Sequence, residues 1–150
     1  MTTTVTTPQD LLPLVGQTLG TTEWVSIDQD RVNLFADATD DHQWIHVDPE
    51  KAANGPFGGI IAHGYLTLSL APVLLQEAVV VEEFSAALNY GLNKVRFPSP
   101  VPVGSRLRAT VDLVSAQDKN GAIEAVFRLT YEVDGADRPA CIAETVVLYR

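Results

Sequence analysis

The sequence has few of the features that mark a secreted or membrane-embedded protein. Cys141 is the single cysteine among 150 residues, so no disulfide can form within one chain and a cytoplasmic location is expected. No apolar run reaches the roughly 18 residues that suggest a membrane span. Residues 1–8 are Thr-rich and lack the basic and apolar regions of a signal peptide. We therefore expect neither export nor a membrane partner.

Basic residues are also scarce. Ten Lys and Arg stand against 19 Asp and Glu, which gives a formal net charge of −9. This balance disfavours nucleic acid and anionic membranes as general partners, although a local basic group can still bind the phosphates of a small ligand. Hydrophobic residues make up 46% of the chain, enough for a packed core. We expect one domain over residues 1–150, with residues 1–8 as a flexible tail.

The first half of the chain predicts short, mainly helical elements, beginning with a helical lead-in at residues 8–14. Residues 18–27 are typical of a strand, because threonines, Trp24 and Val25 suit a pleated surface. Ser26 or Asp28 can cap a helix over about residues 29–38, in which apolar residues recur at helical spacing. A polar, irregular stretch follows, and Pro49 then opens one short helical turn.

A buried helix and a run of strands are predicted for the rest. Residues 64–78 are apolar on nearly every side, as in a helix enclosed by protein, and Pro72 should kink it. Four β-type runs then alternate with turn-rich segments, at residues 86–97, 106–116, 122–133 and 140–149. The pattern indicates an α+β fold, with an antiparallel sheet of about five strands around the central buried helix.

Titratable side chains concentrate in residues 38–49, which hold three carboxylates and two of the three histidines. Taken singly, an Asp here can end a helix or form a turn, and His46 can be a half-buried structural histidine. The cluster lacks the spaced histidines or second cysteine of a metal site, so no metal is expected. The glycine-rich loop at residues 55–59 lacks the Lys-Ser/Thr ending of a phosphate-binding loop.

Three segments, read in order, resemble the MaoC-like dehydratases and (R)-specific enoyl-CoA hydratases. Residues 35–49, FADATDDHQWIHVDP, resemble the hydratase signature Gly-Asp-x-Asn-Pro-Leu/Ile/Val-His with its following Asp-Pro helix. Residues 60–66, IIAHGYL, resemble the segment that opens the central helix of the hot-dog fold. VRF at residues 95–97 and PVPVG at residues 100–104 resemble the family's strand and following turn. The resemblance spans about residues 14 to 149.

The signature departs from the family pattern at three positions. Asp40 replaces the usual Gly, Gln43 the usual Asn, and Trp44 the usual Pro. The Gln-Trp pair resembles the branch of the family that is similar to nodulation protein N. Asp40 places a second carboxylate beside Asp41, and like charges this close can raise the pKa of one of them.

The resemblance implies a lyase that adds water syn across a trans-2-enoyl-CoA to give the (R)-3-hydroxyacyl-CoA, in fatty-acid or other lipid metabolism. It assigns catalysis to Asp41 and His46, and the oxyanion role to the N–H of Gly64. Gln43 is expected to hydrogen-bond the catalytic pair or the water. An acyl-CoA is then the substrate, no cofactor is needed, and a homodimer is expected because pairing covers an exposed sheet edge.

Two other readings remain open. A hot-dog thioesterase cleaves the thioester and does not need the pair formed by Asp41 and His46, so release of thiol from saturated acyl-CoA would indicate it. A catalytically impaired partner subunit of a heteromeric dehydratase would bind ligand without turnover, and Asp40 is the residue that suggests it.

Overall fold

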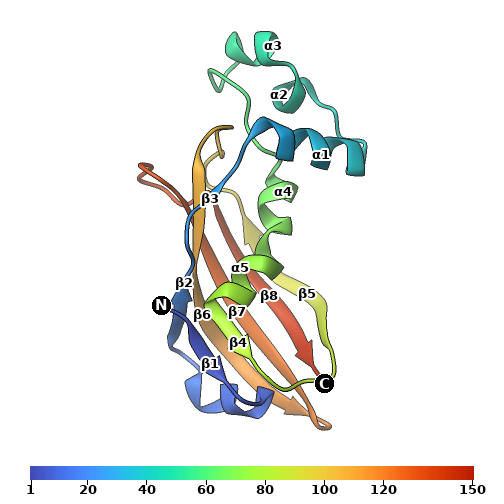
Figure 1. Cartoon of the computed structure of the whole chain (residues 1–150), viewed down its shortest axis with the longest axis vertical. Helices are drawn as coiled ribbons and strands as arrows, with labels where there is room; N and C mark the ends of the chain where they lie inside the picture. Colours follow the sequence, from blue (N-terminus) through green and yellow to red (C-terminus); the bar gives the residue numbers. More distant parts are fainter.

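A twisted antiparallel sheet forms the body of the protein in the computed structural model, which describes residues 1–150. The strand order is β2–β6–β7–β8–β5, and the short β3 pairs with β6 (Figure 1). The strands of this sheet are β2 (Thr18–Thr21), β3 (Val25–Ser26), β5 (Ala87–Arg96), β6 (Arg106–Lys119), β7 (Ala122–Val133) and β8 (Cys141–Tyr149). The prediction of about five antiparallel strands is confirmed.

The predicted central helix is present as two consecutive helices, α4 (Gly64–Ser69) and α5 (Ala71–Ala78), along one face of the sheet (Figure 1). They join at Leu70, two residues before Pro72, which has no N–H to continue the α4 ladder. Leu74 is 1% exposed and belongs to the same core as Leu107 and Leu129 of the sheet. Burial of every second residue of β6 fits the alternation read from the sequence.

Three short helices lie together at one end of the sheet, beyond α4 (Figure 1). They are α1 (Gln29–Thr39), α2 (Trp44–Val47) and α3 (Pro49–Ala53). The carboxylate of Asp28 caps α1 by accepting from the Arg31 N–H at 2.8 Å, and Asp48 caps α3 through the Lys51 N–H at 3.0 Å. These caps fix where each helix begins and hold the connecting residues over the α4 end.

Several elements differ from the prediction. The first eight residues do not form a loose tail, because β1 (Thr3–Val5) pairs in parallel with β4 (Val79–Val81). The helical lead-in predicted at residues 8–14 is confirmed as a 3-10 helix at Pro8–Leu14. The strand predicted over residues 18–27 is divided into β2 and β3. The polar stretch contains α2, which was not predicted. No helix in the structure has both the length and the apolar character needed to cross a membrane.

Candidate active site

His46 lies in α2 with 6% of its surface exposed. Its Nδ1 is 2.6 Å from the Ile61 carbonyl oxygen, which can only accept, so Nδ1 carries the proton and Nε2 keeps its lone pair. The Ile61 N–H in turn donates to the Ile45 carbonyl at 3.1 Å, and Ile61 forms a bridge with Pro102. The backbone therefore selects the tautomer and the orientation that leave His46 with a free base.

Burial lowers the pKa of His46 from its ordinary value of 6.5, and this effect outweighs the opposing hydrogen bond to Ile61. The neighbouring His63 lowers the pKa further, whereas the Asp41 carboxylate raises it. The imidazole is therefore neutral at pH 7. A neutral ring with a free Nε2 can accept a proton from water.

Asp41 follows directly after the left-handed end of α1. Asp40 ends that helix at φ 59°, a conformation that glycine adopts without strain and that Asp tolerates better than most residues. The family's glycine therefore occupies a position with a backbone requirement, and Asp40 meets the same requirement. The pKa of the exposed His42 is raised mainly by its hydrogen bond to Asp37, with a smaller contribution from the charge of Asp40.

His63 contacts both of the proposed catalytic residues, Asp41 and His46. It is 2% exposed, and its Nε2–H donates to the backbone carbonyl of Asp41 at 3.0 Å. Its ring stacks on that of His46, with centroids 3.9 Å apart and planes at 26°. Its Nδ1 is buried without a hydrogen-bond partner. His63 thus fixes the backbone of Asp41 and one face of His46, and it directly precedes Gly64.

Asp41, His46 and His63 each offer a ligand atom, and these atoms lie within 4.8 Å of one another. An ion held by two histidines lies near both ring planes, at about 2.0–2.1 Å from each nitrogen. The ring centroids of His46 and His63 are 3.9 Å apart and the two planes are inclined by only 26°, so the planes converge only far from the rings. The arrangement therefore fits proton transfer better than metal binding.

Gly64 begins α4, where the first N–H groups of a helix have no intrahelical partner. A Cβ at this position would lie 3.3 Å from the Phe97 ring, so any side chain would require that ring to move. The close packing with Phe97 and the need for an accessible N–H both favour glycine here.

Gln43 differs in detail from its expected role. Its backbone N–H, rather than its side-chain amide, approaches Asp41, at 3.4 Å from Oδ1, and the Gln43 side chain is exposed. Gln29 instead supports the site from α1, because its amide donates to the His46 carbonyl at 2.9 Å. Trp44 packs on Gly55, where a Cβ would lie 2.9 Å from the indole. Trp44 therefore shapes the glycine-rich loop.

Comparison with known proteins shows the family of this chain. The model of the family described as "MaoC like domain" matches residues 10–135. The chain belongs to the MaoC-like dehydratase family. It is 57% identical to "3-hydroxyacyl-thioester dehydratase Z" of Mycobacterium tuberculosis over 93% of each chain. Over 93% of this chain and 88% of the relative, it is 44% identical to "Nodulation protein N" of Rhizobium leguminosarum bv. viciae.

A solved structure confirms the fold of this MaoC-like chain. The "(R)-hydratase from A. caviae involved in PHA biosynthesis" superposes with a TM-score of 0.72 and 24% identity, covering 87% of this chain and 95% of the hydratase. The predicted hot-dog fold and the predicted hydratase/dehydratase class of lyase are both confirmed by the comparisons.

Proposed function

We propose that the protein adds water to a trans-2-enoyl thioester, giving the (R)-3-hydroxyacyl thioester, and catalyses the reverse dehydration. The observation that carries this proposal is the neutral His46, which keeps a free Nε2 and has a ring nitrogen within 4.8 Å of an Asp41 carboxylate oxygen, near the first residue of α4. A base and a carboxylate held together in this way can both hydrogen-bond the same water molecule. The 57% identity to a 3-hydroxyacyl-thioester dehydratase supports the same chemistry.

In the proposed reaction, Asp41 orients the water through a hydrogen bond and His46 Nε2 accepts its proton. The hydroxyl oxygen forms a bond to C3 of the substrate while negative charge moves to the thioester oxygen. The Gly64 N–H stabilises that charge, an interaction worth about 3–4 kcal/mol in comparable enzymes. The proton then passes from His46 to C2 on the same face, so that the hydrogen and hydroxyl of one water add syn.

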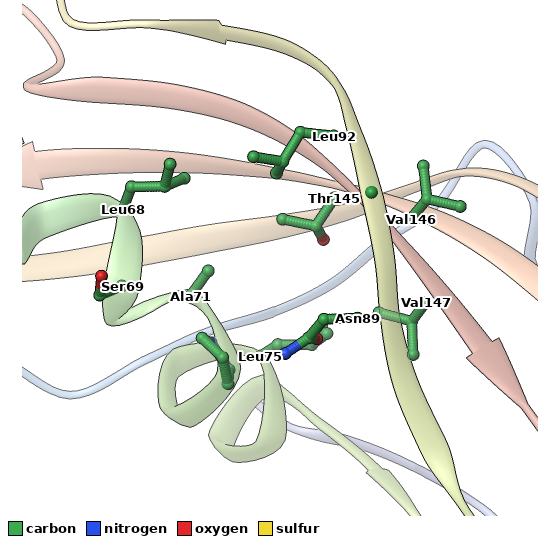
Figure 2. A pocket seen from close by; sticks show the side chains of 11 residues that line it. Leu68, Ser69, Ala71, Leu75, Asn89, Leu92, Thr145, Val146 and Val147 are labelled. Atoms are coloured by element: carbon green, nitrogen blue, oxygen red, sulfur yellow. The ribbon is translucent and has the colours of Figure 1, made fainter. Parts of the chain in front are cut away.

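A groove of about 410 Å³ between the α4–α5 helices and β5 is our candidate for the acyl chain (Figure 2). Leu68 and Leu75 contribute apolar walls from the helices, and Val146 from β8. The groove begins one turn along α4 from Gly64. Leu66 and Leu70 of the same helical segment are core residues and do not line the groove, and Trp44 packs against Gly55.

The thiol of Cys141 has no part in this chemistry. Cys141 is buried in the core, and burial raises the pKa of its thiol to about 12. Such a thiol is a poor nucleophile at neutral pH.

An acyl-CoA as the substrate and the cytoplasm as the location remain part of our proposal. Arg106 and Arg108 of β6 already pair with Asp134 and Glu132 of the protein itself.

The direct test is to incubate the purified protein with crotonyl-CoA and longer trans-2-enoyl-CoAs and to follow loss of the conjugated-enoyl absorbance. Loss of absorbance without release of thiol supports hydration. Release of thiol from a saturated acyl-CoA would instead support the thioesterase reading. A folded protein that binds ligand without turnover would support the impaired-partner reading.

The activity should respond to pH through His46. Protonation removes the Nε2 lone pair, so activity falls as pH drops through the pKa of His46, which burial holds below 6.5. We expect kcat/KM for crotonyl-CoA to be half-maximal below pH 6.5. His42→Gln is the matched control, because His42 is exposed and its raised pKa would place any effect on the opposite side of 6.5. A midpoint at or above 6.5 that moves in the control would contradict the assignment.

We also propose a homodimer formed through β5, the strand at one end of the sheet. Leu88, Tyr90 and Leu92 of this strand are 47%, 69% and 49% exposed. An unpaired edge with exposed apolar side chains is favourable for pairing with a second copy. Light scattering should give about twice the chain mass of 16.2 kDa.

Tyr90→Asp should shift that mass toward the monomer, because it places a charge in the paired edge. Leu34→Asp, on the 70% exposed Leu34 of α1, should not change the mass. A monomeric wild type at micromolar concentration would contradict the dimer.

A further inference from the structure

A second groove of about 280 Å³ adjoins the candidate acyl groove along α5 and extends toward β4 and Phe84. The two grooves share four lining residues: Pro72, Leu75, Asn89 and Val147. Asn89 is the only polar residue among the four. It therefore lies where the two grooves meet.

Irregular pairing of β5 determines the direction of the Asn89 side chain. The pairing of β5 with β8 shifts register between Asn89 and Gly91, and again between Leu92 and Lys94. Such bulges bend a strand and redirect its side chains. Figure 2 shows Asn89 extending from β5 toward Leu75 on α5. The Asn89 side chain is exposed and no other residue pairs with its amide, so in the free protein its polar atoms are hydrated.

We propose that Asn89 sets the upper length of the acyl chain that the enzyme prefers, an inference that rests on the proposed hydratase function. An acyl chain confined to the first groove leaves the amide hydrated. A longer chain crosses Asn89 into the second groove and strips that water without offering a hydrogen bond, which is unfavourable. The free energy gained by burying further CH₂ groups in the second groove is then offset by the cost of dehydrating the Asn89 amide.

The rise per residue along α4 and α5 gives an approximate value for this upper length of the acyl chain. At about 1.5 Å per residue, Pro72 and Leu75 lie roughly 12–16 Å along the helical path from Gly64. An extended acyl chain advances roughly 1.25 Å per carbon, given C–C bonds of about 1.5 Å at tetrahedral angles. The chain therefore reaches Asn89 at about 10–13 carbons.

The test compares kcat/KM for crotonyl-CoA, trans-2-dodecenoyl-CoA and trans-2-hexadecenoyl-CoA in the wild type and in Asn89→Leu. Leucine has a similar volume and no polar atoms. We expect the ratio of hexadecenoyl to dodecenoyl activity to rise about tenfold in the variant, the effect of about 1.4 kcal/mol. Asn93→Leu is the matched control, because Asn93 is exposed on the same strand and lines neither groove; its ratio should equal that of the wild type.

Asn89→Ala, which adds no bulk, should change the ratio in the same direction and serves if the leucine variant folds poorly. An unchanged ratio in a folded Asn89 variant, with wild-type hydration intact, would overturn the role of Asn89 and leave the proposed function standing. Absence of hydration by the wild type on all three substrates would overturn the proposed function itself, and the inference with it.

Discussion

Asp41→Asn should lower kcat for hydration of crotonyl-CoA by about 10²–10⁴-fold, the usual contribution of a positioned proton-transfer group. The substitution keeps the size of the side chain and removes the charge that orients the water. The backbone carbonyl of Asp41 still accepts from His63, so the local fold is retained. We therefore expect KM and the melting temperature to change little.

Asp40→Asn is the matched control for that experiment. It removes the same charge one residue away, from a side chain that ends α1 and is exposed. Its activity should stay within a few-fold of the wild type, measured by the same loss of enoyl absorbance. If the two variants lose activity equally, the catalytic carboxylate has been assigned to the wrong residue.

His46→Gln should also reduce kcat by about 10²–10⁴-fold, because glutamine offers no group that titrates near neutral pH. The residual rate should lose the fall that the wild type shows at acidic pH. Rates measured from pH 5 to 8 would show this, and retention of the wild-type pH profile would exclude His46 as the titrating base.

The double variant of Asp41→Asn and His46→Gln gives a further check. Residues that act as one unit are strongly non-additive, so the double variant should be little slower than the slower single variant. Multiplication of the two effects would mean that the residues act in separate steps.

The sequence predicted the elements that repeat a strong local pattern. The alternation in residues 107–113 identified β6, and the apolar run from residue 64 identified the buried helices, including the interruption near Pro72. The pairing of Thr3–Val5 with Val79–Val81 was missed. Both strands have three residues, and their partnership joins distant parts of the chain, so no local periodicity reveals it.

The candidate site was also predicted from the sequence only in part. The resemblance to the family pointed to Asp41, His46 and Gly64, and the structure brings these segments together. It did not reveal the Ile61 carbonyl that selects the His46 tautomer, because a backbone oxygen leaves no trace in residue type. Gln29 was also missed, since an amide on a helix surface is ordinary until its partner is known. For Gln43 the sequence pointed to a side-chain role, whereas its backbone makes the contact with Asp41.

The proposed catalytic groups and the residues that fix them lie almost entirely within residues 41–64. This short segment sits over one end of the sheet, whereas β5 to β8, which supply most of the fold and the proposed dimer edge, all follow it in the chain. The proposed catalytic groups and the proposed dimer edge are therefore encoded in separate stretches of sequence, although the acyl groove takes Asn89 and Leu92 from β5. A copy of this protein could lose its activity through a few changes in one stretch and still assemble, which gives duplicated genes a direct route to dimers with one working and one silent half.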